Sequence, residues 1–220
     1  MADTGGFIFG VDLDGVCGDY TAAFRRVVAN ERGVDPGDLG DQRSWDFGEW
    51  GIDRDEFERL HRVAVLEHRM FRSMPPMPGA AESLWRLSDA GVWIRIITHR
   101  LVVNWGHAVA VSDTVEWLDR VGIPYRDLCF LGHKPQVECD LYVDDAPHNV
   151  LGLREHGARV VVFDAPYNHD VDGPRAHTWA ELEALVVDAA AAAGFAVQTQ
   201  LGGLDRPADR LRPTGGGDGR

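Results

Sequence analysis

Short apolar segments alternate with segments of helical spacing along most of the chain after residue 79. Strands are predicted at 92–98, 127–131, 140–144 and 158–163, and a fifth precedes them at 7–12. Helices are predicted at 80–90, 109–121, 147–156 and 181–193. Such alternation builds a parallel sheet that is covered by helices on both faces. We therefore predict an α/β fold that binds its ligands beyond the carboxyl ends of the strands.

The first strand is followed by about sixty residues that do not fit this alternation, which is too many for a plain loop. Two helical patterns, 20–31 and 54–71, flank a segment that contains Trp45, Phe47 and Trp50. We predict a small helical cap over residues 16–78, inserted into a core of residues 1–15 and 79–195. Its hinges are expected near Gly15–Gly18 and Pro75–Gly79. Residues 196–220 are rich in Gly, Pro and charge, and are expected to form a disordered tail.

Composition excludes several classes of partner. The net charge of −13 argues against binding to a nucleic-acid polymer or to an anionic membrane, since both need a basic surface. No apolar run reaches the length of a membrane span, and the N-terminus does not resemble a signal peptide, so a cytoplasmic protein is expected. The three cysteines, Cys17, Cys129 and Cys139, fit neither a disulfide framework nor a metal site, and are predicted to be reduced and buried.

Two pairs of acidic residues follow predicted strands. Asp12 and Asp14 end the first strand, next to a glycine that permits a sharp turn, and Asp144 and Asp145 end the strand at 140–144. Carboxylates that are buried close together repel one another unless a cation or a shared proton compensates them. If the two strands are neighbours, these acids form an oxygen cluster that suits Mg²⁺. Zn²⁺ is less suitable, because no His or Cys has ligand spacing here.

Lys134 is the only lysine in a chain with 21 arginines, and it precedes the second acid pair by ten residues. An ammonium group is a compact charge that can lie between two anions, whereas guanidinium is a planar fork. Thr98, at the end of the second core strand, offers a hydroxyl and the backbone N–H groups that follow it. These donors suit the oxygens of a phosphate group.

The order of these motifs, each at a strand end, resembles that of the haloacid dehalogenase superfamily of phosphatases. Within that superfamily, the sequence is most similar to the cytosolic-type 5'(3')-deoxyribonucleotidase family, from about Phe7 to about Val187. The stretches that carry the resemblance are VDLDGVCGDY, FRSMPPMPGAAESLWRL, IITHR, HKPQVECDLYVDDAP, VVFDAPYNH and RAHTWAELEAL. The resemblance implies a Rossmann-like core with a small helical cap inserted after the first strand.

The resemblance also implies catalytic roles. Asp12 would be the nucleophile that forms an aspartyl-phosphate, and Asp14 the acid that protonates the leaving oxygen and then acts as base toward water. Mg²⁺ would be held by Asp12, the backbone carbonyl of Asp14 and Asp144, with Asp145 as a further ligand or an outer partner. A structural alternative remains open for Asp145, which could cap the helix that follows it. Thr98 and Lys134 would bind and neutralise the transferred phosphoryl group.

In the family that the sequence resembles, aromatic residues of the cap sandwich the base of a nucleoside monophosphate. The candidates are Tyr20, Trp45, Phe47 and Phe71, of which Trp45 is favoured because it lies in a turn-rich segment. The sequence departs from the family at His99 and Arg100, where Ser and Pro are usual, and at Gly132, where Arg is frequent. His99 could be a phosphate donor, a leaving-group contact or a surface residue, and the role of His133 is equally open.

Three functions remain at this point. The first is a Mg²⁺-dependent phosphomonoesterase that acts on nucleoside 5'-monophosphates, deoxy forms included. The second keeps this chemistry for another small phosphate ester, such as a sugar phosphate or a biosynthetic intermediate. The third, a receiver-like phospho-acceptor module, would place its acid pair, acceptor Asp, Thr and Lys in a different order. The sequence leaves open the base and sugar preference, the pathway and the oligomeric state, a homodimer included.

Overall fold

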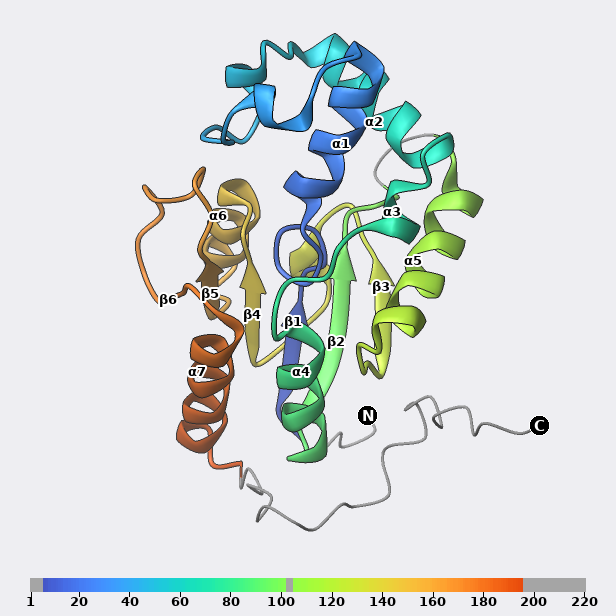
Figure 1. The fold of residues 1–220 in the computed structure, drawn as a ribbon. Helices are drawn as coiled ribbons and strands as arrows, with labels where there is room; N and C mark the ends of the chain where they lie inside the picture. The colour runs from blue at the N-terminus through green and yellow to red at the C-terminus, as the bar shows by residue number, and fades with distance from the viewer. Residues whose placement is uncertain (1–5, 102–104, 196–220) are drawn as a thin grey trace, which may run out of the picture.

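Six parallel strands form the central sheet of the computed structural model, which describes residues 6–101 and 105–195 (Figure 1). The strands are β1 (Ile8–Val11), β2 (Trp93–Thr98), β3 (Asp127–Phe130), β4 (Leu141–Asp144), β5 (Val160–Phe163) and β6 (Arg175–Ala176). They lie in the order β3-β2-β1-β4-β5-β6, and every neighbouring pair is parallel. The predicted parallel α/β sheet is therefore confirmed. The sequence did not predict β6, which has only two residues.

Seven α-helices accompany this sheet in the described residues. They are α1 (Tyr20–Arg32), α2 (Arg54–Leu66), α3 (Met70–Ser73), α4 (Ala80–Asp89), α5 (His107–Val121), α6 (Pro147–Glu155) and α7 (Trp179–Ala192), and three short 3-10 helices are η1 (Pro36–Leu39), η2 (Gly48–Trp50) and η3 (Lys134–Gln136). The single helix predicted at 54–71 is wrong, because the chain breaks at Arg69, which has φ +50°. Arg69 Nε and Nη2 instead donate to the two carboxylate oxygens of Asp113 in α5, at 2.7 and 2.5 Å.

Two hydrophobic clusters cover the two faces of the sheet. The larger cluster joins residues such as Ile94 and Ile96 to α4, α5 and α7, while the smaller joins Ile97 and Val162 to α6. This division follows from the alternation of side chains along a strand, because residues 96 and 97 point to opposite faces. Strands that are buried on both faces have the continuous apolar sequences from which they were predicted.

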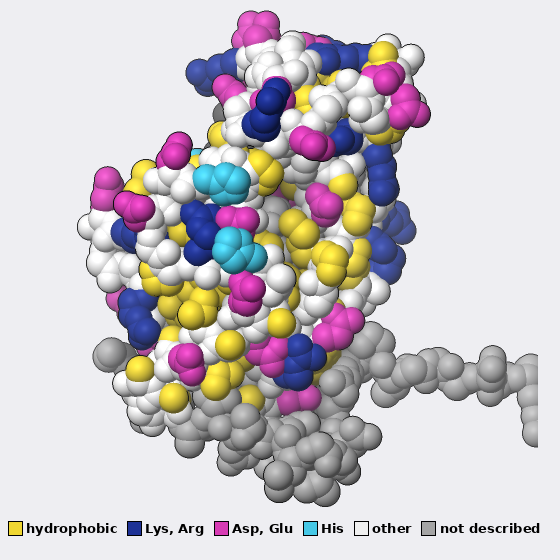
Figure 2. Space-filling view, turned by 60° about the vertical axis from the view of Figure 1, so that its left-hand side comes forward, with side chains coloured by type: hydrophobic (Ala, Val, Ile, Leu, Met, Phe, Trp, Pro, Cys, Tyr) yellow, Lys and Arg dark blue, Asp and Glu magenta, His cyan; other side chains and the backbone are white. Residues whose placement is uncertain are grey.

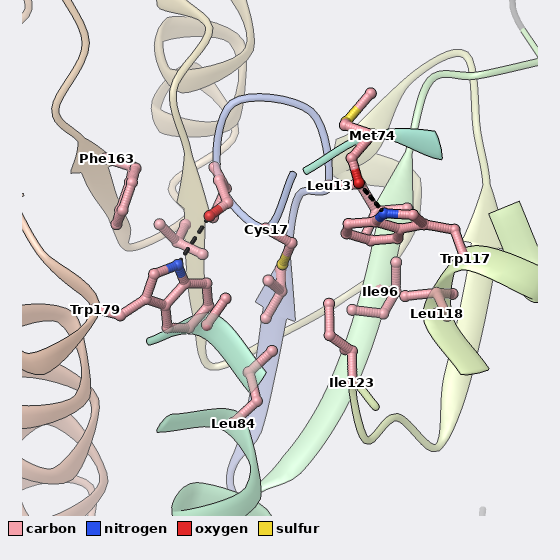
Figure 3. Packing of buried hydrophobic residues seen from close by; sticks show 14 of the residues in the cluster. Leu13, Cys17, Met74, Leu84, Ile96, Trp117, Leu118, Ile123, Phe163 and Trp179 are labelled. Atoms are coloured by element: carbon pink, nitrogen blue, oxygen red, sulfur yellow. Dashed lines mark hydrogen bonds between the residues drawn. The ribbon is translucent and has the colours of Figure 1, made fainter. Parts of the chain in front are cut away.

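Two buried indoles tie the core to the segments that lead into and out of the long insertion. Trp179 Nε1 donates to the Val16 carbonyl at 2.8 Å, and Trp117 Nε1 donates to the Met74 carbonyl at 2.7 Å (Figure 3). Both rings are among the largest fully buried side chains. A buried indole that satisfies its N–H in this way fixes the backbone it contacts as well as filling the core.

The helical insertion, which we define as residues 20–73, lies above the carboxyl ends of the strands (Figure 1). The segments that connect it to the core run side by side, since Asp19 N donates to Pro75 O at 2.8 Å and Met77 N donates to Cys17 O at 2.7 Å. Figure 2 shows the insertion as a smaller upper lobe, with acidic, basic and hydrophobic side chains interspersed over the visible face. The boundaries 1–15, 16–78 and 79–195 stay a prediction.

The insertion contacts the core on two sides. On one side α3 packs against α5, and the Arg69–Asp113 pair and the Trp117–Met74 bond connect them. On the other side Trp45 places its ring edge-on against two rings of the core, those of His148 and Tyr167, with centroids 5.2 Å away in both cases.

Three expectations concern other parts of the chain. The predicted disordered tail, 196–220, lies outside the described residues. None of the helices in the described residues is both long and apolar enough to cross a membrane. Cys17 is buried as predicted, whereas Cys129 and Cys139 are only half-buried, at the less enclosed edge strand β3 and in the loop before β4; all three thiols are free.

Candidate active site

The acid pairs meet where the strand order reverses, between β1 and β4. From β1 the chain proceeds through β2 and β3 to one edge of the sheet, and from β4 through β5 and β6 to the other. Asp12 N donates to Val143 O at 3.2 Å, which continues the pairing of the two strands up to their carboxyl ends. Asp12 and Asp144 therefore lie side by side at the position where such sheets form a ligand crevice.

Lys134 lies between these two carboxylates. It begins η3, is 3% exposed, and its Nζ donates to Asp12 Oδ1 at 2.6 Å and to Asp144 Oδ2 at 2.5 Å. Burial alone would lower the pKa of Lys134, but the two carboxylates outweigh it and raise that pKa, so the ammonium remains charged. Burial raises the pKa of Asp12 to about 7 despite Lys134, and repulsion from Asp144 and Asp14 adds to the rise.

Asp145 completes a cluster that can hold a metal ion. Single carboxylate oxygens of Asp12, Asp144 and Asp145 all lie within 4.8 Å of one another. Asp145 Oδ1 is buried and finds no hydrogen-bond partner, and burial together with the neighbouring Asp12 and Asp144 raises the pKa of Asp145 well above its usual value. An unpartnered oxygen in a crowded anionic site is what a bound cation would satisfy, and this all-oxygen donor set fits Mg²⁺.

The capping alternative for Asp145 is wrong, because α6 has Ala146 at its N-cap without a side-chain cap bond. Asp144 is the acid that serves the start of this helix. Its Oδ1 accepts from Ala146 N at 3.0 Å and from Asn149 Nδ2 at 3.2 Å, while its Oδ2 binds Lys134. Asp144 is therefore oriented by three donors, whereas Asp145 keeps one oxygen free for a ligand.

Asp14 is held by Arg100, a residue whose role the sequence left open. The Arg100 guanidinium donates through Nε and Nη2 to the two oxygens of Asp14, at 3.0 and 2.7 Å. Its Nη1 donates to Thr114 Oγ1 at 3.0 Å, and its Cζ lies 4.2 Å from the centre of the Phe71 ring. This buried guanidinium fixes the direction of the carboxylate to which the family resemblance assigns proton transfer.

Thr98, His99 and His133 take different positions around the site. Thr98 is fully buried and its hydroxyl accepts from Arg100 N at 3.4 Å, so its side chain does not line the cavity described below. His99 is half-buried, lines the cavity, and has a buried Nε2 without a partner. Burial and the charge of Lys134 lower the pKa of His99 to about 4, so the ring is neutral. His133 is exposed and packs against His156 instead.

A cavity of about 380 Å³ connects the acid cluster with the insertion. Its lining contains Asp12, Asp14 and Lys134 together with several rings, including all four that the sequence predicted: Tyr20, Trp45, Phe47 and Phe71. Tyr20, Phe47 and Phe71 also pack in the interior of the insertion, whereas Trp45 is 47% exposed and available to a ligand. The volume and the mixture of polar groups and rings in the lining suit a small molecule that has both a charged and an aromatic part.

The structure adds lining residues that the sequence did not single out. They include Thr21, Gln42, Phe57, His61, His148, Asn149 and Tyr167. His148, Asn149 and Tyr167 follow the carboxyl ends of β4 and β5, where parallel sheets place their ligand-binding loops. If we had searched the loop after every predicted strand, the sequence would have indicated all three of these residues. Nothing local in the sequence marks the polar pair of Thr21 and Gln42 in the insertion.

Solved structures define the class of protein. A hydrolase of the haloacid dehalogenase-like family from Streptococcus pneumoniae matches with a TM-score of 0.55 at 15% sequence identity, over 83% of this chain and 99% of that one. A haloacid dehalogenase-like protein of unknown function from Agrobacterium tumefaciens gives 0.54 at 15% identity, over 84% of this chain and 100% of that one. The fold is therefore that of the haloacid dehalogenase-like proteins.

Sequence comparison then defines the family. The model for "5' nucleotidase, deoxy (Pyrimidine), cytosolic type C protein" matches residues 6–192, and the chain belongs to this family. A protein of Chlorobaculum tepidum named "Putative 5'(3')-deoxyribonucleotidase" is 44% identical over 178 residues, which cover 80% of this chain and 87% of that protein. A protein of the same name from Bordetella bronchiseptica is 28% identical over 75% of this chain and 88% of its own length.

The resemblance read from the motifs is thus confirmed, and the receiver-like alternative is wrong. The protein is an enzyme, a phosphomonoester hydrolase of the 5'-nucleotidase type.

Proposed function

We propose that the enzyme hydrolyses nucleoside 5'-monophosphates, deoxy forms included, through a phosphorylated Asp12 and with the help of Mg²⁺. The observation that carries this proposal is the single cavity that joins the cluster of Asp12, Lys134 and Asp145 to the ring-lined wall with Trp45. The phosphate of the substrate would lie beside Asp12 and Lys134, and its base would lie beside Trp45. The deoxyribonucleotidase names of the relatives agree with this substrate.

The described residues supply the parts that the reaction needs. Asp12 would attack the phosphorus atom, and the bond between phosphorus and the ester oxygen would break as that oxygen takes a proton from Asp14. Water would then attack the phosphoryl group on Asp12 while its proton goes to Asp14, which frees phosphate and restores both acids. Arg100 holds the Asp14 carboxylate in place for both proton transfers through hydrogen bonds to its two oxygens.

Charge compensation comes from two sources in this proposal. Lys134 would offset the repulsion between Asp12 and the incoming phosphate. Thr98 would bind this phosphate through the backbone N–H groups that follow it, because its hydroxyl accepts a hydrogen bond from Arg100 N. Asp12, Asp144 and Asp145, with the backbone carbonyl of Asp14, would hold Mg²⁺, which when bound neutralises negative charge on the phosphate oxygens. A cytoplasmic location and a homodimer stay predictions.

Phosphate release from a panel of substrates tests the proposed function. The panel contains ribo- and deoxyribonucleoside 5'-monophosphates and sugar phosphates, each assayed after removal of metal with a chelator and again after addition of Mg²⁺. We expect the nucleotides to be cleaved fastest and the activity to depend on added metal. Faster cleavage of sugar phosphates than of every nucleotide would favour the second function considered from the sequence.

Trp45→Ala should weaken the binding of nucleotides without slowing small substrates. Stacking of a base on an aromatic ring contributes about 1–3 kcal/mol, which corresponds to a rise in KM of about 5- to 150-fold. For glycerol phosphate, which has no base, kcat/KM should be unchanged. Trp45→Phe should recover much of the nucleotide KM, and Leu151→Ala, a change at an exposed apolar residue outside the cavity, serves as the control. Equal losses on both substrates would contradict a base-binding role.

His99→Ala tests whether the buried, unpartnered Nε2 donates a hydrogen bond to the substrate phosphate. We expect KM to rise about tenfold or more, as for loss of a hydrogen bond to a charged group. Because the lowered pKa of about 4 leaves the ring uncharged above that pH, the ratio of wild-type to variant kcat/KM should stay constant from about pH 5.5 to 8. A ratio that falls through pH 6.5 would show instead that His99 acts as a cation. His133→Ala is the matched control outside the cavity.

A further inference from the structure

Tyr167 connects the loop after β5 to the acid cluster. Its hydroxyl donates to Asp145 Oδ2, and its ring is half-buried at the wall of the cavity. Asp145 Oδ1 is buried and has no partner. The hydrogen bonds of Lys134 that hold carboxylates go to Asp12 and Asp144 and not to Asp145. In the described residues, the side chain of Asp145 is thus held on one oxygen alone, by Tyr167.

The loop that carries Tyr167 is fastened to the backbone of the same aspartate. Asn168 is 1% exposed, and its Nδ2 donates to the carbonyls of Asp145 and Phe163, both at 2.8 Å. Its Oδ1 accepts from Ala165 N at 3.1 Å and from Arg175 Nη1 at 2.6 Å. All four hydrogen-bonding positions of the amide are therefore used. Tyr167 is presented to Asp145 from a fixed backbone.

Gly15 leaves room for this contact on the opposite side. A Cβ atom at this position would lie 2.0 Å from Asp145 Oδ2 and 3.0 Å from the Tyr167 hydroxyl, and the backbone has φ +84°. Only glycine can adopt this positive φ without strain and also leave the space that the Asp145 carboxylate occupies. The turn after Asp14, the carboxylate of Asp145 and the phenol of Tyr167 therefore fit together as one closely packed unit beside the predicted nucleophile.

We propose that Tyr167 is a positioning residue of the cation site. By holding Oδ2, it fixes the carboxylate and leaves Oδ1, which has no hydrogen-bond partner, available to a divalent cation that Asp12 and Asp144 would share. Partners that orient metal ligands in this way change metal affinity by about 10- to 100-fold when they are removed. This inference rests on the proposed function, because it requires the acid cluster to bind a cation.

The test is the affinity of the substrate-free enzyme for Mn²⁺, followed by the electron paramagnetic resonance signal of free Mn²⁺. Tyr167→Phe keeps the ring and its contact with Trp45 but removes the hydroxyl, and we expect it to weaken binding about tenfold or more. Tyr125→Phe removes the hydroxyl of a partly buried tyrosine in the loop before β3, outside the cavity, and should leave the affinity unchanged. Equal affinities of wild type and Tyr167→Phe would overturn the proposal.

A double-mutant cycle distinguishes positioning through Asp145 from any other effect of Tyr167. If the hydroxyl acts only by orienting that carboxylate, Tyr167→Phe should cause little further loss in an Asp145→Asn background. The full tenfold loss in both backgrounds would overturn the assignment. Thermal unfolding that shows Tyr125→Phe folded like wild type, and Tyr167→Phe not, would also overturn it. Absence of Mn²⁺ binding by wild type, by contrast, would remove the cation from the proposed function itself.

Discussion

Asp12→Asn should lower kcat by at least about 1000-fold, because an amide nitrogen or oxygen cannot replace the carboxylate that we propose to attack phosphorus. The substitution is nearly isosteric, and an amide oxygen can still accept from Lys134 Nζ, which lies 2.6 Å from Asp12 Oδ1. The fold should therefore persist while the chemistry is lost. Steady-state phosphate release from the preferred nucleotide gives the ratio of the two kcat values.

Two further measurements make this result specific. Asp188→Asn applies the same change to an exposed acid of α7 and should leave kcat unaffected. Wild type quenched rapidly in acid during turnover should carry the mass of one phosphoryl group on the peptide that contains Asp12, and Asp12→Asn should not. Activity of Asp12→Asn within about tenfold of wild type would show that another group is the nucleophile.

Lys134→Arg should lose most of its activity although the charge is retained. The ammonium group is 3% exposed and bonds two carboxylates at 2.6 and 2.5 Å, so the larger planar guanidinium does not fit between them without moving Asp12. We expect kcat to fall about 10- to 100-fold, as for a misplaced reacting group. Arg54→Lys, the reverse exchange at an exposed position of α2, is the control.

Lys134→Met separates the loss of charge from the change of shape. It leaves the buried Asp12 and Asp144 without their shared cation, and breaking a buried ion pair from one side costs about 3–5 kcal/mol. We therefore expect a lower free energy of unfolding in denaturant as well as loss of activity, with added Mg²⁺ restoring part of the stability. Near-normal turnover of Lys134→Arg would mean that any cation serves at this position.

The parts of the site that the sequence predicted are those whose signals are local. An apolar run that ends in acids marks a buried strand and its carboxyl end, and this pattern placed Asp12 and Asp144 at two strand ends, which the structure shows to be neighbours. Lys134 stood out because it is the only lysine in the sequence. The structure adds that it lies between these two carboxylates, which gives a physical reason for an ammonium group at that position.

The parts that the sequence could not predict depend on partners far along the chain. The break between α2 and α3 occurs where Arg69 reaches Asp113, 44 residues later, and the helical pattern of 54–71 contains no sign of that partner. The pairing of Asp14 with Arg100 crosses 86 residues. β6 pairs with β5 over so few residues that no periodicity can develop. In each case a tertiary contact, rather than local propensity, decided the structure.

The unequal attachment of the insertion has a consequence for the order in which products leave. On the α3 side, the two charged hydrogen bonds of Arg69 to Asp113 and the buried bond of Trp117 hold it firmly, whereas on the other side Trp45 makes edge contacts with the rings of His148 and Tyr167. Thermal opening should therefore swing about α3 and widen the mouth beside Trp45. In the proposed reaction the nucleoside, whose base would lie beside Trp45, should then depart first. Inorganic phosphate, which would lie near Lys134, should depart last and compete with fresh substrate for the free enzyme.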